Sequence, residues 1–174
     1  MSKHISGRGI YDLVPKDQKI TGLEIGVDVG DTADYMLDNL PGLTLHGIDP
    51  YVGYVDWNGM DLNQKQRNWC EDAAENVLSQ YGDRYILHKD YSDNIVDNFQ
   101  DEMFDYIFID GLHTYDQVLK DCENYYSKLK PGGVFAGHDY RAIEGVRKAA
   151  DEFAAKVGAT ISETEIDVWY WIKP

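Results

Sequence analysis

The sequence predicts an α/β fold in which a doubly wound, mostly parallel sheet carries helices on both faces. Short apolar runs alternate with longer segments of helical spacing along the whole chain. Polar side chains follow each of the first five apolar runs, at the point where a strand would end. The last two runs have no helical segment between them, which indicates an antiparallel closing pair. Strands that are separated by helices form this kind of sheet.

The predicted strands are short apolar runs that turn residues interrupt. Residues 104–109 (Phe-Asp-Tyr-Ile-Phe-Ile) are the clearest example, because they end at Asp110-Gly111. In chain order the strands are residues 20–25, 43–48, 84–88, 104–109 and 134–137, followed by the closing pair 159–162 and 168–172.

The predicted helices repeat apolar residues at intervals of three and four and are followed by Gly or Pro. In chain order they are residues 32–40, 61–81, a short helix that ends at Phe99, 115–129 and 143–157. Residues 51–60 form a loop of aromatic side chains with Gly and Asn. Such a loop suits a flexible cover over a bound ring or sugar, or it packs onto the adjacent helix.

Length and charge limit the classes of function. The 174 residues predict one domain over 1–174. A formal net charge of −15 disfavours nucleic-acid binding, which depends on neutralised phosphates. No apolar run has the length of a membrane span, and Met1–His4 lack the apolar core of a signal peptide, so we expect a cytoplasmic protein without a membrane partner. Cys70 and Cys122 are expected to be reduced core residues.

The segment from Leu23 to Thr32 (Leu-Glu-Ile-Gly-Val-Asp-Val-Gly-Asp-Thr) predicts a ligand-binding turn between a strand and a helix. Gly26 and Gly30 would let a ligand approach the backbone at the positive end of the helix dipole. Glu24 precedes the first glycine and would attract a cationic ammonium, which a diphosphate lacks. The segment therefore indicates S-adenosylmethionine, with an ordinary strand-to-helix turn as the alternative.

Two further strand ends fit an adenosyl ligand. Asp49 follows the next strand, about twenty residues after the turn, where a carboxylate accepts both ribose hydroxyls and repels a 2′-phosphate. Asp90-Tyr91-Ser92 follows the third strand and could contact an adenine. The alternative for this second group is a helix N-cap.

The remaining strand ends carry acid–base groups. Asp110 and His113 follow the fourth strand, and His138-Asp139 follow the fifth. Because these strand ends meet at one edge of the sheet, the four side chains suit a hard divalent cation or proton transfer. Carboxylates select Mg²⁺ over zinc, and no His/Cys zinc spacing occurs in the sequence.

The sequence resembles the class I S-adenosylmethionine-dependent methyltransferases, and more closely their small branch rich in O-methyltransferases. The resemblance runs in order over residues 20–172. The matching segments are Glu24-Ile25-Gly26-Val27 with Gly30-Asp31-Thr32, Gly47-Ile48-Asp49-Pro50, Phe104 to Tyr115 (Phe-Asp-Tyr-Ile-Phe-Ile-Asp-Gly-Leu-His-Thr-Tyr), Leu129-Lys130-Pro131-Gly132-Gly133 and Gly137-His138-Asp139-Tyr140.

The resemblance implies a Rossmann-like sheet of seven strands with an antiparallel last strand. It also implies S-adenosylmethionine as the cofactor and a small-molecule acceptor. The cofactor would contact the glycine turn, the second and third strand ends and the start of the Asp-Gly-x-His segment: Glu24, Gly26, Gly30, Thr32, Asp49, Tyr51, Asp90, Tyr91 and Asp110.

The resemblance also bears on catalysis. Related sugar and antibiotic O-methyltransferases hold a Mg²⁺ on aspartates at the positions of Asp110 and Asp139. Here His138 stands where some relatives have another aspartate, and Asp28 stands where many have glycine. The acceptor proton would pass to His113 or His138, or a metal on Asp110 and Asp139 would acidify the hydroxyl.

Two alternatives of other classes remain at this point. An NAD-linked oxidoreductase shares the sheet, but the turn is not G-x-G-x-x-G and Glu24 would face a diphosphate. A non-catalytic S-adenosylmethionine-binding protein would lack an acceptor site. The chain has no long insertion after the fifth strand, so the substrate wall would come from residues 10–13, from residues 51–60 or from a second subunit of a homo-oligomer.

Overall fold

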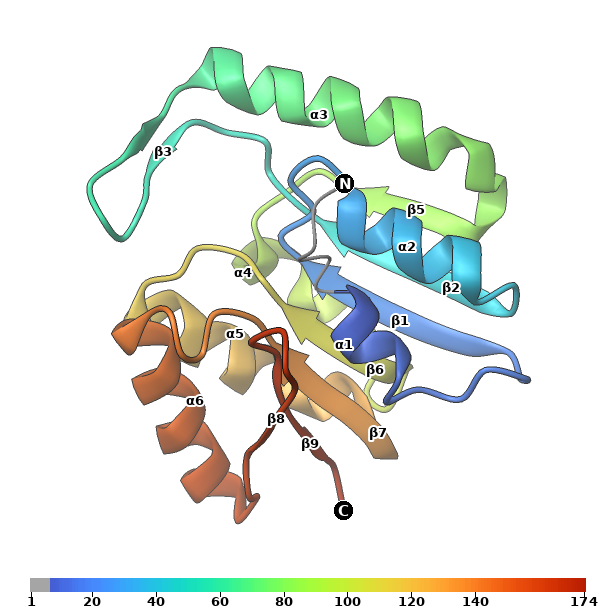
Figure 1. Cartoon of the computed structure of the whole chain (residues 1–174), viewed down its shortest axis with the longest axis vertical. Coiled ribbons are helices and arrows are strands. Elements are labelled where there is room, and N and C mark those ends of the chain that lie inside the picture. Colours follow the sequence, from blue (N-terminus) through green and yellow to red (C-terminus); the bar gives the residue numbers. More distant parts are fainter. Residues whose placement is uncertain (1–6) are drawn as a thin grey trace.

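The computed structural model describes residues 7–174 and contains a seven-stranded sheet in the order β5-β2-β1-β6-β7-β9-β8 (Figure 1). Five strands are parallel, while β9 runs antiparallel to β7 and to β8. The predicted α/β sheet with an antiparallel last strand is therefore confirmed. Residues 1–6, which include the segment Met1–His4 used for the signal-peptide expectation, lie outside the described residues.

The elements follow the predicted alternation. The strands of the large sheet are β1 (Ile20–Ile25), β2 (Leu43–Ile48), β5 (Tyr85–His88), β6 (Phe104–Ile109), β7 (Leu129–Gly137), β8 (Ser162–Glu163) and β9 (Trp169–Ile172). The α-helices are α1 (Gly7–Tyr11), α2 (Asp31–Asn39), α3 (Gln64–Leu78), α4 (Ser92–Ile95), α5 (Tyr115–Tyr125) and α6 (Glu144–Val157). Short 3₁₀ turns extend α3, α4 and α5, and β3 (Tyr54–Val55) and β4 (Asp61–Leu62) form a separate antiparallel hairpin.

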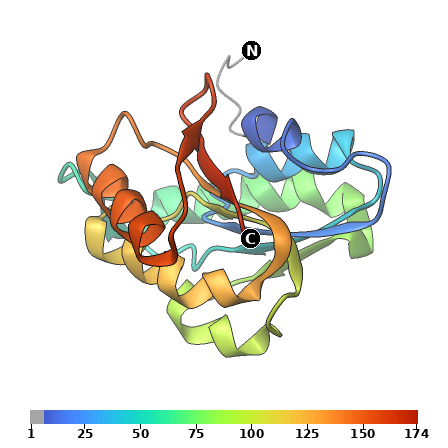
Figure 2. The same ribbon diagram turned by 90° about the horizontal axis from the view of Figure 1, so that it is seen from below.

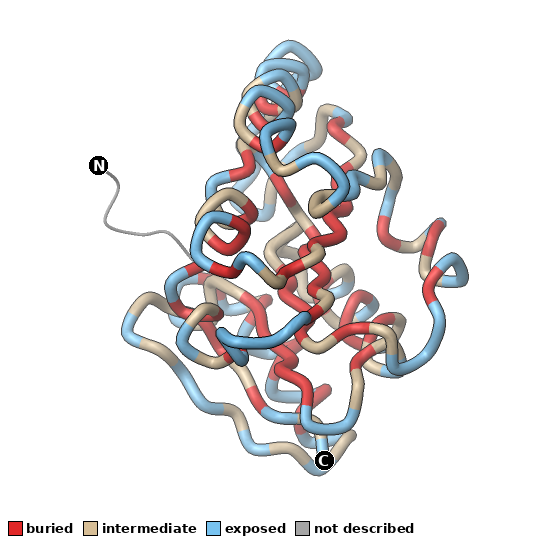
Figure 3. The backbone as a smooth tube through the Cα atoms, turned by 90° about the vertical axis from the view of Figure 1, so that its right-hand side faces the viewer, coloured by how far each residue is buried: buried red, intermediate tan, exposed pale blue. Residues whose placement is uncertain are grey.

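The helices cover both faces of the sheet, so the molecule has three layers (Figure 2). On one face α1, α2 and α3 pack over a cluster that includes Ile10, Met36 and Leu78. On the other face α4, α5 and α6 pack over a cluster that includes Cys122 and Phe153. The central strands are buried almost throughout (Figure 3), as expected for a parallel sheet between two helical layers.

The parallel register aligns the carboxyl ends of the strands. Ile25 pairs with Ile48 on one side and with Ile109 on the other, so the polar residues after these strands meet at one edge. The β3–β4 hairpin projects on this same side of the sheet (Figure 1). Among residues 7–174, no helix is long and apolar enough to cross a membrane.

The structure corrects the expectations between residues 51 and 85. The sequence predicted a loop followed by a helix over 61–81, but residues 61–62 are β4 and the helix begins at Gln64. Asn63 caps this helix together with Gln66 in a reciprocal capping box, which fixes its start. Its regular part ends at Leu78 and a 3₁₀ turn follows, because Gly82 adopts a left-handed φ of 53°.

Two strands at the end of the chain also differ in extent. The strand predicted at 134–137 is the second half of β7, which begins at Leu129. The strand predicted at 159–162 is reduced to β8 (Ser162–Glu163), an exposed edge strand that pairs with two residues of β9. An exposed edge offers little burial to hold a longer strand in place.

Candidate functional site

A cavity of about 700 Å³ opens at the carboxyl edge of the sheet. It lies between the glycine turn after β1, the segment after β2, the start of α3, the start of α4 and the loop after β6. Residues from four of the five predicted strand ends line it, among them Glu24, Asp49, Tyr91 and Asp110. The volume and the position fit a cofactor-sized molecule at the place where open α/β sheets bind their ligands.

The glycine turn is required by the protein's own packing. Gly26 has a φ of 93°, and a Cβ on it would lie 2.2 Å from the carbonyl oxygen of Asp110. Gly30 has a φ of 86° at the N-cap of α2 and packs against Leu78. The structure gives both glycines conformational and packing reasons, and the predicted close approach of a ligand, which the position of Gly26 in the cavity lining allows, stays a prediction. The turn still lines the cavity through Val27, Asp28 and Thr32.

Glu24 is a buried carboxylic acid at the floor of this cavity. The residue is 2% exposed, and within the described part of the chain its Oε2 atom has no hydrogen-bond partner. Burial raises the pKa of Glu24 well above its usual range, and the negative charges of Asp110 and Asp49 raise it further. A cation bound in the cavity would remove this penalty, because it would supply the missing partner and favour the charged carboxylate.

Asp49 accepts five hydrogen bonds from four donor groups within the protein. Its Oδ2 accepts from the backbone N–H groups of Val27 and Asp28, and its Oδ1 accepts from the N–H of Tyr51. The guanidinium of Arg67 donates to both oxygens at 3.0 Å. A ribose hydroxyl would therefore have to replace one of these donors, and the role of Asp49 in ribose binding stays a prediction.

Arg67 is the cation that organises this part of the site. It is 5% exposed on α3, and its Nη1 atom donates to Asp28 at 2.7 Å while Nη2 contacts Asp49. Tyr51 and Tyr54 present their rings to the guanidinium at 5.4 and 5.7 Å. The arrangement ties α3 to the glycine turn. It leaves the Asp28 side chain, which is 63% exposed, at the cavity wall.

Of the three residues predicted to contact an adenine, Tyr91 lines the cavity and Asp90 and Tyr51 do not. Tyr91 lines the cavity and is 52% exposed, whereas the Oδ1 of Asp90 accepts from the N–H of Tyr91 and from the side chain of Asn94. Tyr51 is buried beneath the cavity, and its hydroxyl donates to the carbonyl of Asp28. Its neighbour Val52 lines the cavity instead. The adenine assignment therefore stays a prediction for these residues.

A polar network that the sequence did not predict forms another part of the wall. Asp121 on α5 is 1% exposed, and its Oδ1 accepts from the Ser92 hydroxyl at 2.6 Å and from the Gln117 amide at 3.2 Å. Burial raises the pKa of Asp121 to about 7. All three residues line the cavity beside Tyr91. They offer donors and acceptors for a polar ring.

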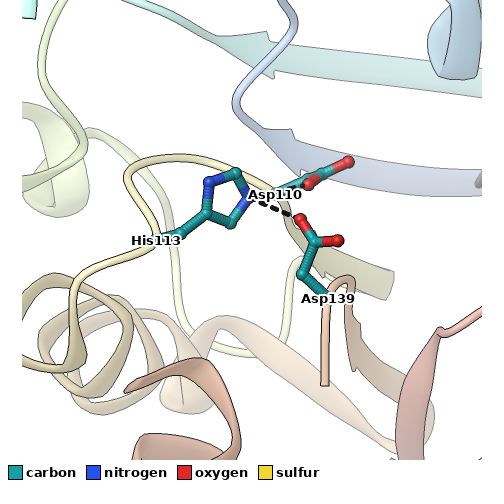
Figure 4. Close-up of side chains that lie close together, drawn as sticks. All are labelled: Asp110, His113 and Asp139. Atoms are coloured by element: carbon teal, nitrogen blue, oxygen red, sulfur yellow. Dashed lines mark hydrogen bonds and ion pairs between the residues drawn. The ribbon is translucent and has the colours of Figure 1, made fainter. Parts of the chain in front are cut away.

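The four predicted acid–base residues meet beside the cavity. The Nε2 atom of His113 lies 3.0 Å from Oδ2 of Asp139 and 3.3 Å from Oδ1 of Asp110, and it points into the space between the two loops (Figure 4). The Nδ1 atom of His138 lies 3.2 Å from Asp139, while its Nε2 donates to the carbonyl of Ile166. Asp139 adopts a left-handed φ of 60°, which a functional constraint often explains.

The charges in this cluster reinforce one another. Burial alone would lower the pKa of His113, but hydrogen bonds and charges from Asp110 and Asp139 outweigh it and raise the pKa to about 10. The pKa of His138 is also raised, since the same two carboxylates outweigh its burial. In turn the two histidines hold the pKa of Asp139 below its usual range. His113 is therefore an imidazolium at neutral pH, and Asp139 keeps its charge beside it.

The sequence analysis did not single out Arg67, Asp28 or Asp121 as binding residues. Arg67 did carry a signal, because it lies on the same face of α3 as Cys70, Ala74 and Leu78, which are buried. A charged residue on an apolar helix face indicates a buried ion pair.

The fold and the site together define a class. A seven-stranded sheet of this order, with a cavity at its carboxyl edge, is the architecture of the class I S-adenosylmethionine-dependent methyltransferases. The model of the methyltransferase domain family matches residues 23–140, and the chain belongs to this family. The family binds S-adenosylmethionine, which disfavours the NAD-linked alternative.

Individual relatives are distant. The sequence is 28% identical to an uncharacterised protein of Acanthamoeba polyphaga mimivirus over 143 residues, which are 80% of this chain and 62% of the viral protein. The chain therefore spans less than two thirds of that relative.

Solved structures share the fold. A protein from Corynebacterium glutamicum superposes with a TM-score of 0.71 and 14% identity, covering 99% of this chain and 82% of that one. A candidate caffeoyl-CoA O-methyltransferase from Staphylococcus aureus superposes with a TM-score of 0.72 and 17% identity, covering 100% of this chain and 85% of that one. The precorrin-6y C5,15-methyltransferase from Geobacter metallireducens superposes with a TM-score of 0.67 and 13% identity, covering 94% of this chain and 85% of that one.

Proposed function

We propose that this protein binds S-adenosylmethionine in the cavity and transfers its methyl group to a hydroxyl of a small molecule. The observation that carries the cofactor assignment is Glu24 at the floor of the cavity, whose buried Oε2 atom has no hydrogen-bond partner among residues 7–174. S-Adenosylmethionine carries an ammonium and a sulfonium, and either cation would stabilise the charged form of Glu24. The proposed contacts otherwise follow the predicted residues that line the cavity, such as Thr32 and Tyr91.

The acid–base cluster supports oxygen as the acceptor atom. In the proposed step, the acceptor oxygen forms a bond to the methyl carbon while the carbon–sulfur bond breaks and its electron pair stays on sulfur. The hydroxyl proton passes to Nε2 of neutral His113, which forms when the imidazolium loses its Nε2 proton, so the products are a methyl ether, S-adenosylhomocysteine and a protonated imidazole. The protein contributes alignment of the two reactants, which supplies a large part of the rate in such transfers.

A divalent cation fits the same cluster. One ligand atom from each of Asp110, His113 and Asp139 lies within 4.8 Å of the others, and two of the three are carboxylate oxygens, which Mg²⁺ prefers. When bound, the ion would acidify the hydroxyl and offset the carboxylate charges that keep the proton on His113. We therefore propose Asp110 and Asp139 as the residues that hold it.

The second candidate is a non-catalytic protein that binds the cofactor alone. The cluster disfavours it, because two imidazoles and two carboxylates converge beside the cavity without closing it off. A binding protein has no need of such a concentration of acid–base groups.

Calorimetric titration with S-adenosylhomocysteine, S-adenosylmethionine and NAD, each with and without Mg²⁺, tests the cofactor. We expect both sulfur compounds to bind and NAD not to bind, and binding of NAD alone would refute the proposal. Release of S-adenosylhomocysteine from S-adenosylmethionine is then measured with a panel of catechols and glycosides. Replacement of Asp139 by Asn should reduce turnover at least about 100-fold while leaving cofactor affinity within about twofold.

A further inference from the structure

The β3–β4 hairpin carries a third carboxylate to His113. Asp56 follows β3 directly, and its Oδ1 atom lies 4.0 Å from Nδ1 of His113. Its side chain is only 13% exposed, although the neighbouring turn residues Trp57 and Met60 are about half exposed. The carboxylate of Asp56 thus turns away from solvent and toward the imidazole, and His113 has acidic groups at both ring nitrogens.

The two sides of the ring differ in what they face. Nε2 faces Asp110 and Asp139 beside the cavity, whereas Nδ1 faces away from them (Figure 4). Nδ1 lies nearest the Asp56 carboxylate of the hairpin. We propose that Asp56 is a positioning residue whose carboxylate faces the Nδ1 side of His113 and fixes the orientation of the ring, so that Nε2 is the ring nitrogen turned toward the cavity. The use of that orientation in methyl transfer rests on the proposed function, and the contact with Asp56 does not.

A role in the turn alone does not explain the charge of Asp56. Its Oδ1 accepts from the N–H of Trp57 at 2.8 Å, and its backbone groups bond to Gly59 and Met60. The side-chain oxygen of Asn serves such a turn as well as that of Asp. A negative charge is of use to a cationic or donating neighbour, and within residues 7–174 the ion-pair partner of Asp56 is His113.

The hairpin is also joined to the cavity. The side chain of Gln64 accepts from the N–H of Gly53 and donates to the carbonyl of Tyr51, which fixes the base of the hairpin. Tyr54 and Leu62, the pair that closes β3 on β4, line the cavity. The position of Asp56 therefore depends on the same segment that borders the cavity.

The substitution Asp56→Asn tests this inference, because it keeps the turn acceptor and removes the charge. Asp61→Asn is the matched control, since Asp61 is an exposed carboxylate of β4 on the same hairpin. The full chain is labelled with ¹⁵N-histidine, and the Nδ1–H signal of His113 is assigned by its loss in His113→Gln. We expect this proton to exchange with water about tenfold faster in Asp56→Asn and to be unchanged in Asp61→Asn.

Further measurements separate the alternatives. Asp56→Glu keeps the charge and should retain most of the protection of the His113 Nδ1 proton from exchange. A purely structural role of Asp56 in the turn predicts the reverse, with protection retained in Asp56→Asn and lost in Asp56→Glu. Unchanged exchange in a folded Asp56→Asn protein, or equal loss in Asp61→Asn, would overturn the inference. S-Adenosylhomocysteine affinity is measured in parallel. If the wild type fails to bind it while the exchange results hold, the proposed function fails and the Asp56–His113 contact stands.

Discussion

The carboxyl groups of Glu24 and Asp110 stand at the ends of the neighbouring strands β1 and β6, and the charge of Asp110 adds to burial in raising the pKa of Glu24. The strands fix this proximity, because the N–H of Asp110 donates to the carbonyl of Ile25 at 2.8 Å. Negative charge on Glu24 is therefore costly in this part of the cavity. A bound cation would relieve the repulsion between two carboxylates that the sheet holds together.

Cofactor binding should release a proton from Glu24. The raised pKa favours the protonated form of this group in the free protein, and a cationic ligand would favour its charged form, so affinity for S-adenosylhomocysteine should increase with pH until Glu24 is ionised without ligand. Calorimetry in buffers of different ionisation heat would detect the proton. Glu24→Gln should abolish its release and weaken binding about tenfold, whereas Glu75→Gln on the exposed side of α3 should change neither. Proton release that survives in Glu24→Gln would assign it to another group.

The strand ends could be predicted from the sequence because the buried strands appear in it as short apolar runs. Short apolar runs define β1, β2 and β6 within one residue, and a parallel sheet brings their ends to one edge whatever the details of the loops. Asp110, His113, His138 and Asp139 were placed together on this basis, and their side chains do meet.

The partners of these residues could not be predicted in the same way. Asp49 looks like a free acceptor in the sequence, and only the register of α3 against the glycine turn brings Arg67 to it. Asp56 depends on a hairpin whose strands have two residues each, too short for a periodic pattern. Side chains that depend on one particular packing contact leave no local signal in the chain.

Replacement of Arg67 should lower the free energy of unfolding of the protein. Arg67→Met would leave Asp49 buried without its cation, and loss of one partner of a buried ion pair costs about 3 kcal/mol in the free energy of unfolding. Denaturant unfolding followed by circular dichroism measures the change. Lys65→Met, an exposed position on the same helix, is the control and should cost less than about 0.5 kcal/mol. Equal effects of the two substitutions would show that Asp49 is satisfied by backbone donors alone.

Substitution by alanine should cost more stability at Gly26 than at Gly132, although both glycines have a positive φ. Gly26 and Gly132 have φ values of 93° and 78°, but a Cβ on Gly26 would clash with the Asp110 carbonyl while nothing lies within 4 Å of one on Gly132. Gly132→Ala should therefore cost only the left-handed conformation, about 1 kcal/mol. Gly26→Ala adds the displacement of β6 and should cost more than about 3 kcal/mol. Thermal unfolding compares the two variants, and similar losses would mean that the turn relaxes freely.

The stacked pair His46 and His88 should make the protein less stable in mild acid. Their Nδ1 and Nε2 atoms are 3.0 Å apart, and Phe99 and Phe104 pack edge-on against the ring of His46. Burial, with a smaller contribution from His88, lowers the pKa of His46 to about 4 in the folded protein. In the unfolded chain the pKa returns to about 6.5.

The sign of the effect follows from proton uptake. Between pH 6.5 and 4 the unfolded chain binds a proton that folded His46 does not, so the contribution of neutral His46 is complete above pH 6.5 and is lost as the pH falls through this window. Urea unfolding at pH 7.5 and pH 5 measures the loss in the wild type. His46→Gln cannot be protonated and should lose less stability between the two pH values, although it is less stable than the wild type at pH 7.5. An equal loss in both proteins would assign the acid sensitivity to other groups.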